Sequence, residues 1–368
     1  MKLELGFQGY GAAEIREVND CLNSGDVTMG KRVMRFERMF AEYVGVKHAV
    51  MVNSGSSANL LAVAALIEAG ILPRGVEVPV PALTWPTTLW PVIQNGMTVR
   101  LLDCDAKTLC VPPQLHGRCF AVHVMGNAAQ DYAILEDCCE ALGARINGKH
   151  VGSSSHAATF SFYYSHHMTT VEGGMVVTWD DEVADILRSM RSHGWTRGTK
   201  REGISYGGID PRFLFVHPGY NLRPTEIQAA FGIHQLPRVD GWNAHRKQVY
   251  AEMRRRLEVC GLFDFIEPTP NSEPSWFAFP VLVKGGLRAM LSAYLEQAGI
   301  QTRPTIAGNL ARHPAFRNRA DIVWDALPNA DRVMNDGLYW GCHPGVDDAQ
   351  IEYLVNAVYD FIQKREAA

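Results

Sequence analysis

The sequence has no long hydrophobic run and no excess of basic residues. No apolar stretch approaches the roughly 20 residues that a membrane-spanning helix needs, and the chain does not open with the basic and then apolar pattern of a secretion signal. The formal net charge is −4, which argues against a basic face for nucleic acid. We therefore expect a cytoplasmic protein with neither a membrane nor a nucleic-acid partner.

Cysteine is present, but without the pattern of a disulfide framework or a metal site. The eight cysteines are scattered over 368 residues, and the adjacent pair Cys138 and Cys139 has neither a CxxC partner nor a histidine at ligand spacing. With 47% hydrophobic and 20% charged residues, a chain of this length can bury a large core. We expect a folded protein of a reducing compartment, with no metal site and with its cysteines packed as small apolar side chains.

Strand-like and helix-like segments alternate over the first two thirds of the chain. Short apolar runs that predict strands occur at residues 49–52, 76–80, 98–102, 118–125 and 133–135. The alternation predicts an α/β fold with a mostly parallel central sheet between helices, which binds ligands at the carboxyl ends of its strands. A helical pattern at residues 239–257 connects to a smaller α+β unit. We expect a large domain at residues 1–244 and a small C-terminal domain at residues 245–368.

Small polar residues follow the run at 49–52 and lead into a helical pattern that we expect to begin near residue 60. Gly55, Ser56 and Ser57 lie in this transition, where free backbone N–H groups and the helix dipole attract a phosphate. Serine-rich helix starts are common, however, and most of them cap only their own helix. This motif alone is a weak signal.

Three more residues of interest follow predicted strands. They are Trp85, Asp137 and His166. His166 and its neighbour His167 come after an apolar run that we expect to be a buried strand up to Tyr164. Alone, Asp137 is explained as a helix cap, and the histidine pair as one buried and one solvated residue. Together with the helix start they suit pyridoxal phosphate, which needs a phosphate site, an aromatic stack and an acid at its ring nitrogen.

Five segments resemble the signature segments of the nucleotide-sugar aminotransferases, fold-type I enzymes that use pyridoxal phosphate. The segments are residues 53–56, 81–85, 135–144, 172–174 and 219–230. The resemblance implies an aspartate-aminotransferase-like large domain and a homodimer with shared active sites, or a dimer of such dimers. It implies that Trp85 stacks on the ring and that Asp137 pairs with the pyridine nitrogen. The phosphate would be held by Gly55, Ser56, Ser57 and Ser161, with Asn221 from the neighbouring subunit.

The chain lacks the lysine to which these aminotransferases attach the cofactor. His166 stands in its place, and no lysine occurs between Lys149 and Lys200. An imidazole cannot form a Schiff base with the cofactor, but its ordinary pKa of about 6.5 suits a general base. In this respect the chain resembles the sugar 3-dehydratases of the family.

That resemblance implies loss of the 3-hydroxyl from a nucleotide-linked 4-keto-6-deoxyhexose, with GDP-4-keto-6-deoxy-D-mannose as the implied substrate. Pyridoxamine phosphate would be the reacting form of the cofactor, L-glutamate the amino donor, and ammonia a product. An ordinary 4-aminotransferase and a cofactor-binding pseudoenzyme remain the alternatives.

A related branch of the family also has histidine at this place but carries an iron–sulfur cluster, whose cysteines lie downstream of the histidine. Here no cysteine occurs between Cys139 and Cys260, and only Cys342 follows. Four thiolate ligands cannot be assembled there. We therefore expect no iron–sulfur cluster.

Four further residues are candidates for the site, and three of them have more than one interpretation. Glu140 stands where the aminotransferases usually have glutamine, and the resemblance implies a place near the cofactor's ring oxygen. Arg223 and Arg303 could each clamp a carboxylate or a pyrophosphate, or form surface ion pairs. His193 could contribute to the sugar pocket of a partner subunit, or play a structural part beside Gly194.

Overall fold

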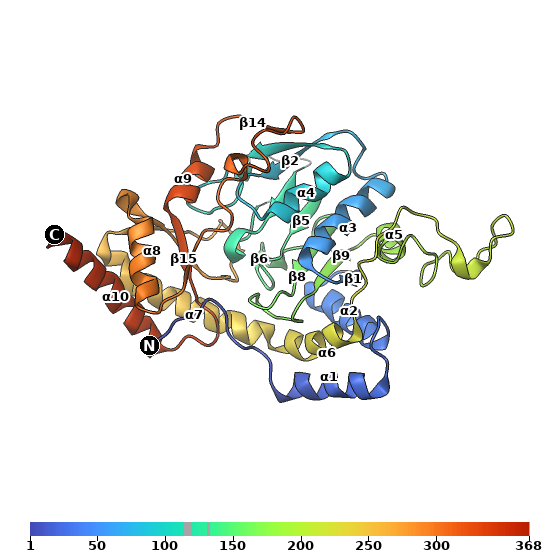
Figure 1. Cartoon of the computed structure of the whole chain (residues 1–368), viewed down its shortest axis with the longest axis horizontal. Helices are drawn as coiled ribbons and strands as arrows, with labels where there is room; N and C mark the ends of the chain where they lie inside the picture. Colours follow the sequence, from blue (N-terminus) through green and yellow to red (C-terminus); the bar gives the residue numbers. More distant parts are fainter. Residues whose placement is uncertain (114–118, 131–132, 368) are drawn as a thin grey trace.

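A central sheet between layers of helices forms the larger part of the molecule (Figure 1). The computed structural model describes residues 1–113, 119–130 and 133–367. Five strands hydrogen-bond in the order β1 (His48–Val52), β9 (Gly174–Thr178), β8 (Ala157–Ser161), β5 (Leu135–Asp137) and β4 (Phe120–Val122). Beside β4 lies β2 (Glu77–Pro81), which pairs with β3 (Thr98–Leu102), and β3 pairs with β14 (Ile322–Trp324).

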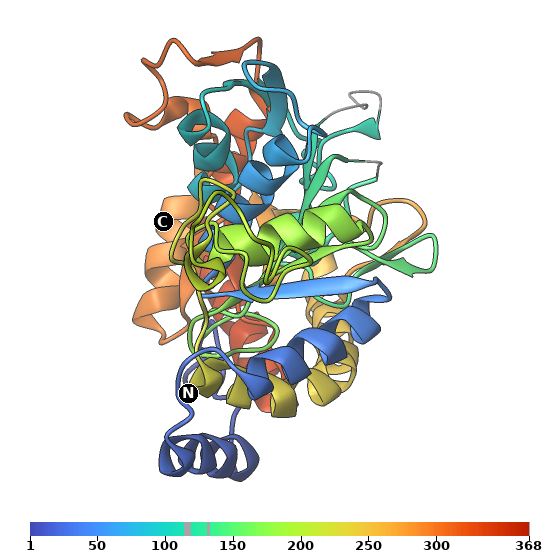
Figure 2. The same cartoon turned by 90° about the vertical axis from the view of Figure 1, so that its right-hand side faces the viewer.

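Side chains of β1 and β9 alternate between two cores. Val50, Val52 and Val176 pack in the core that contains α3, whereas Met51 and Val177 pack in the core that contains α2 and α6. Strands that are covered on both faces read as continuous apolar runs, which explains the sequence pattern. The helices are α2 (Lys31–Val44), α3 (Gly55–Glu68), α4 (Pro86–Gln94), α5 (Asp181–Arg191) and α6 (Glu226–Gln235). Outside these layers, α1 (Ala12–Ser24) packs on α6 (Figure 2).

The direction of the strands agrees with the predicted fold class. Four pairs are parallel, namely β4 with β5, β5 with β8, β2 with β3, and β3 with β14. Only β9 runs against its neighbours β1 and β8 within this sheet of described residues. The prediction of a mostly parallel sheet is confirmed.

Two boundaries differ from the prediction at the functionally important end of the sheet. The strand expected to reach Tyr164 ends at Ser161, and the rings of Tyr163 and Tyr164 are exposed rather than buried. The chain leaves the sheet here to form a turn, so these aromatic side chains line an open cavity instead of the core. The helix expected near residue 60 begins at Gly55, so the small polar residues form its first turn.

The C-terminal unit is built on an antiparallel sheet. Its strands lie in the order β10 (Phe263–Phe265), β12 (Phe279–Val283), β15 (Gly337–Trp340) and β13 (Thr302–Pro304), and its helices are α8 (Arg288–Gln297), α9 (Pro328–Asp336) and α10 (Asp348–Glu366). The long helix α7 (Val239–Leu257) leads into it, as the sequence predicts. Two contacts cross the expected boundary at residue 244: Leu3 bridges to Ile300, and β14 joins the large sheet. The division itself stays a prediction.

One segment projects from the body of the molecule. Residues 195–217, between α5 and α6, form the excursion at the right of Figure 1. Several of its large apolar side chains are exposed: Ile204, Tyr206, Ile209, Phe213, Phe215 and Val216. Among the described residues, no helix combines the length and apolar character needed to cross a membrane.

Candidate active site

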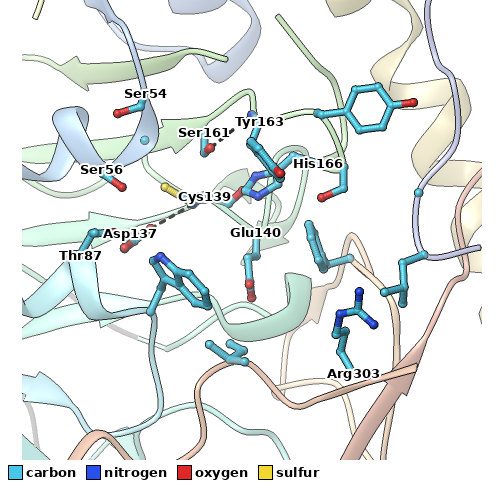
Figure 3. Close-up of a pocket in the computed structure, with 18 of the residues that line it drawn as sticks. Ser54, Ser56, Thr87, Asp137, Cys139, Glu140, Ser161, Tyr163, His166 and Arg303 are labelled. Carbon is cyan, nitrogen blue, oxygen red and sulfur yellow. Dashed lines mark hydrogen bonds between the residues drawn. The ribbon is translucent and has the colours of Figure 1, made fainter. Parts of the chain in front are cut away.

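A cavity of about 860 Å³ opens where the carboxyl ends of β4, β5 and β8 meet the C-terminal unit. Figure 3 shows the residues around it, with Ser54 and Ser56 on the side of α3 and Arg303 across the cavity. Eight of the predicted site residues line it: Gly55, Ser56, Trp85, Asp137, Glu140, Ser161, His166 and Arg303. The N-terminal segment 4–8 also lines it, together with Phe277 and Tyr339 from the C-terminal unit.

Asp137 forms the floor of the cavity. Its side chain is buried, and three donors hold the carboxylate: Asn59 Nδ2 at 2.9 Å, Thr88 Oγ1 at 2.7 Å and the backbone N–H of Cys139 at 3.1 Å. No helix follows β5, because residues 138–144 form turns. The helix-cap explanation for Asp137 therefore fails, and its orientation is set by the other side chains of the floor.

The supporting residues of the floor were not predicted from the sequence. Thr159 donates to Asn59 Oδ1 at 2.6 Å, so the amide nitrogen of Asn59 is turned toward Asp137. The hydroxyl of Thr84 lies 2.8 Å from that of Thr88, which donates to Asp137 and can accept from Thr84. The sequence did contain a signal for one of them, because Asn59 is a polar residue at the start of an apolar run in helix α3, where it is buried.

The start of α3 provides a place for an anion. Ser54 is the N-cap and accepts from the backbone N–H of Ser57 at 3.0 Å, while the Ser54 hydroxyl donates to Ser57 Oγ at 2.9 Å. The Ser57 side chain is therefore engaged in the cap and does not line the cavity, whereas Gly55 and Ser56 do. A Cβ at Gly55 would lie 2.6 Å from Cβ of Ser161, so only glycine lets the helix start approach β8 this closely.

His166 lies in the turn after β8, lines the cavity, and is bonded through one ring nitrogen to the protein backbone. Its Nδ1 lies 2.9 Å from the carbonyl oxygen of Cys139. A carbonyl only accepts, so Nδ1 carries the proton and Nε2 keeps its lone pair. Burial lowers the pKa of His166 to about 4, although the Cys139 carbonyl and the Asp137 carboxylate oppose the effect. The pKa of His166 is thus lower than the ordinary value of about 6.5 expected from the sequence, and the imidazole is neutral at pH 7.

Aromatic rings surround His166. Phe277 meets it edge-on with the ring centroids 5.2 Å apart, and Tyr163 does so at 5.8 Å. Phe277 belongs to the C-terminal unit and was not predicted as a site residue, because only the tertiary fold brings it to this turn. The two rings limit the access of water to the imidazole, in agreement with its lowered pKa.

Glu140, Tyr339 and Arg303 lie near one another on the far side of the cavity. Glu140 accepts from the backbone N–H of Met125 at 2.9 Å, and burial raises its pKa to about 7. Burial raises the pKa of Tyr339 to about 12, with the Glu140 charge adding to the effect and Arg303 opposing it. Arg303 donates to the carbonyl of Thr302 at 2.8 Å and has no carboxylate partner among the described residues.

The charges that line the cavity are unbalanced. Within the described chain, Arg303 is its single arginine or lysine, whereas it has four carboxylic residues: Glu4, Asp137, Glu140 and Glu172. The absence of a lysine there agrees with the substitution seen in the sequence. One guanidinium cannot balance the negative charges of a bound phosphate and an acidic substrate in addition to those of the lining carboxylates.

Three predicted residues lie outside the cavity, at the base of the excursion. Arg223 Nη1 is 3.0 Å from Nε2 of His193, and a backbone bridge joins Ser192 to Asn221. His193 has a left-handed backbone (φ 66°), and its N–H donates to the carbonyl of Tyr220 at 2.6 Å. The structure therefore brings these residues together, but not with the cavity of their own chain.

Three side chains lie close enough together to be considered as metal ligands, but two of them are hydrogen-bonded to each other. His123, Glu136 and Cys138 are buried close together, and His123 also lines the cavity. His123 Nδ1 accepts from the backbone N–H of Ala129 at 2.9 Å, so Nε2 carries the proton and donates to Glu136 at 3.0 Å. A protonated nitrogen has no lone pair for a metal.

Comparison with known proteins places the chain in a family. Residues 9–359 match the model of the DegT/DnrJ/EryC1/StrS aminotransferase family. The chain belongs to this family. The GDP-4-keto-6-deoxy-D-mannose 3-dehydratase of Yersinia pseudotuberculosis is 36% identical over 373 residues, which cover 93% of this chain and 94% of the relative. The dTDP-4-dehydro-2,6-dideoxy-D-glucose 3-dehydratase of Saccharopolyspora spinosa is 35% identical over 381 residues, 92% of this chain and 82% of the relative.

A solved structure extends the similarity to the fold. The crystal structure of GDP-4-keto-6-deoxymannose-3-dehydratase with a trapped PLP-glutamate geminal diamine superposes with a TM-score of 0.91 and 32% identity. The match covers 97% of this chain and 100% of that one. The predicted fold class and the predicted cofactor, pyridoxal phosphate, are thereby confirmed, and the chain is an enzyme of this cofactor-dependent family.

The residues of the cavity fit that cofactor. The start of α3 offers backbone N–H groups to a phosphate, and Gly55, Ser56 and Ser161 line the cavity there. The Asp137 carboxylate suits a protonated ring nitrogen, and the indole of Trp85, 58% exposed, offers a flat face along the cavity. Which side chains touch the cofactor stays a prediction.

Proposed function

We propose that this protein removes the hydroxyl at carbon 3 of a nucleotide-linked 4-keto-6-deoxyhexose, with GDP-4-keto-6-deoxy-D-mannose as the first candidate. The observation that carries the proposal is His166, bonded through Nδ1 to the Cys139 carbonyl, in a cavity whose described lining includes no lysine. L-Glutamate supplies the two electrons and the amine that regenerate pyridoxamine phosphate. The net products are a sugar that has lost one oxygen atom, 2-oxoglutarate and ammonia, and no water is formed overall because the oxygen lost by the sugar is balanced by the keto oxygen of 2-oxoglutarate.

The cofactor, when bound as pyridoxamine phosphate, supplies an amine that condenses with the keto group and a ring that withdraws electrons. Nε2 of His166 removes a proton from the methylene carbon next to that amine. The Nδ1–H bond to Cys139 fixes the direction of this lone pair, and the low pKa keeps the imidazole unprotonated at neutral pH. Asp137 holds the pyridine nitrogen in its protonated form.

The remaining charged groups suit the second substrate. Arg303 has no carboxylate partner among the described residues and faces the cavity, so we assign it to a carboxylate of glutamate, which its planar donor fork can bind in a bidentate way. Glu140, with its raised pKa, lies close enough to influence Tyr339. We place Glu140 beside the ring oxygen of the cofactor.

A homodimer would correct the charge imbalance of the cavity. We propose that Asn221, His193 and Arg223 serve the cavity of a second copy, because they lie outside the cavity of their own chain. The exposed apolar side chains of the excursion 195–217 support an interface there. Arg223 would then add a positive charge for phosphate or pyrophosphate.

One assay tests the proposal. Purified protein is incubated with pyridoxal phosphate, L-glutamate and, in parallel, the GDP-, dTDP- and CDP-linked 4-keto-6-deoxy sugars. We expect ammonia and a product lighter by one oxygen atom with one of these nucleotides. An amino sugar, together with a lysine adduct after borohydride reduction, would instead identify an aminotransferase. Cofactor binding without any product would favour a non-catalytic role.

A further inference from the structure

Residues 275–277 form a short connection directly behind His166. They lead from β11 (Ser272–Glu273) to β12. The backbone N–H of Ser275 donates to the carbonyl oxygen of Gly126 at 3.0 Å, and the backbone N–H of Phe277 donates to the carbonyl oxygen of Met125, also at 3.0 Å. A Cβ at Gly126 would lie 1.8 Å from the Ser275 carbonyl oxygen, so the two backbones touch. One side of this segment is therefore fixed.

Buried side chains hold the carbonyl groups of the same segment. Nε2 of His167 donates to Ser275 at 2.8 Å. Nη1 of Arg246 donates to Phe277 at 2.9 Å and to Trp276 at 3.4 Å. Both side chains are only 1% exposed, and Arg246 has no carboxylate partner among the described residues. Burying such groups is unfavourable unless their hydrogen bonds are needed.

His167 is a poor choice for packing alone. The Ser275 carbonyl requires a proton on Nε2, which leaves Nδ1 without a hydrogen-bond partner in the described structure. A buried nitrogen without a partner disfavours the folded state. A leucine of similar size would avoid that loss, so the hydrogen bond to Ser275 is the feature that histidine adds.

The ring of Phe277 joins His167 to His166. It lies 5.9 Å from the ring of His167 and 5.2 Å from the ring of His166, measured between centroids. His167 therefore acts on Phe277 both through this contact and through the carbonyl two residues earlier. Phe277 in turn covers one side of the imidazole in the cavity.

We propose that His167 is a positioning residue, whose hydrogen bond to Ser275 holds Phe277 against His166 and keeps Nε2 of His166 directed into the cavity. The proposal rests on the proposed function only in that His166 is the base. The other groups that act on the His166 imidazole are the Cys139 carbonyl, the Asp137 carboxylate, the Ser161 backbone and the Arg246 guanidinium.

The first test measures His166 without turnover. The ring of His166 is titrated by NMR in full-length, cofactor-loaded protein with labelled histidines, and its signal is assigned with His166→Asn. In His167→Leu, we expect the pKa of His166 to rise above the wild-type value by about one pH unit, because water reaches the ring. His167→Gln, which can still donate to Ser275, should stay near wild type.

The matched control is His313→Leu. His313 also bonds a backbone carbonyl through Nε2, at 2.7 Å from Ala307, and also meets a phenylalanine, Phe316. It does not line the cavity, so the titration of His166 should not change. If His167→Leu does not fold, Phe277→Leu removes the same ring contact and should raise the pKa of His166 in the same way.

The second test measures turnover. We expect kcat of His167→Leu to fall by about 10- to 100-fold, since a small displacement of a reacting group has this effect, with KM for the nucleotide sugar unchanged. A variant that loses thermal stability but keeps the wild-type kcat and His166 titration would overturn the proposal. If no sugar substrate is turned over, the proposed function fails, and the titration still decides the role of His167.

Discussion

The floor of the cavity, formed by Asp137 and the residues that hold it, differs from the wall, formed by His166 with the rings of Phe277 and Tyr163. On the floor, Asp137 receives three hydrogen bonds, and Asn59 and Thr88, which hold it, are themselves bound. On the wall, Nδ1 of His166 is bonded to the Cys139 carbonyl, and the imidazole lines the open cavity. The floor is saturated and the wall is not. A group that only binds gains from complete satisfaction, whereas a group that accepts a proton must keep one position free.

The largest effect should come from the wall. In His166→Asn we expect dehydration to fall by about 10²- to 10⁴-fold, the usual contribution of a general base. Binding of pyridoxal phosphate, followed by its absorbance, should persist because the floor is intact. Equal turnover in the variant and the wild type would show that another group is the base.

His166→Lys complements that variant. A lysine at this place can attach to the cofactor, which borohydride reduction and mass spectrometry would reveal. We expect the covalent adduct to appear and dehydration to be lost. Retained dehydration with an adduct present would contradict the assignment of His166 as the base.

The floor should respond in cofactor affinity. In Asp137→Asn, the amide nitrogen would face the donors Asn59 and Thr88, and the partner of the pyridine nitrogen would lose its charge. Breaking a buried charge contact of this kind costs about 3–5 kcal/mol, so cofactor affinity should fall by ~10²-fold or more. A titration by fluorescence quenching measures it, with Thr84→Val as a milder change in the same network. Unchanged affinity in Asp137→Asn would remove Asp137 from the cofactor site.

A third place in the cavity, opposite the floor, should affect only glutamate. Arg303→Gln removes a charged donor, a loss of about 1.5–3 kcal/mol, and should raise KM for glutamate by ~10- to 100-fold. KM for the nucleotide sugar should stay constant. The exposed Arg317 provides the matched control, Arg317→Gln. A rise in KM for the sugar instead would assign Arg303 to the nucleotide sugar.

The sequence predicted the central residue of the floor and that of the wall, but not the residues that support them. β3 and α7 have the predicted bounds, and Trp85, Asp137 and His166 lie at one cavity because strand ends share an edge. Phe277 and the N-terminal segment 4–8 reach the cavity through tertiary packing, which leaves no local pattern. The pKa values near 4 for His166 and 7 for Glu140 arise from burial, which depends on residues distant in the sequence.

The smallest expected effect concerns the stability of the folded protein in acid, to which three buried histidines contribute. Burial lowers the pKa of His166 and of His343 to about 4 and that of His167 well below its usual value, and the charge of Arg246 acts on all three. The unfolded chain protonates histidine near pH 6.5, so it binds more protons than the folded chain below that pH. Stability from these residues is thus present above about pH 6.5 and is lost as the pH falls toward 4.

We therefore expect Tm to fall between pH 7 and pH 5, and to fall less in His343→Gln than in wild type. Removing one imidazole removes one proton taken up on unfolding, and a difference of one between the folded and the unfolded pKa corresponds to about 1.4 kcal/mol. His313→Gln, outside this group, should keep the wild-type slope. Identical slopes in all three proteins would mean that carboxylates, and not these three buried histidines, set the acid stability.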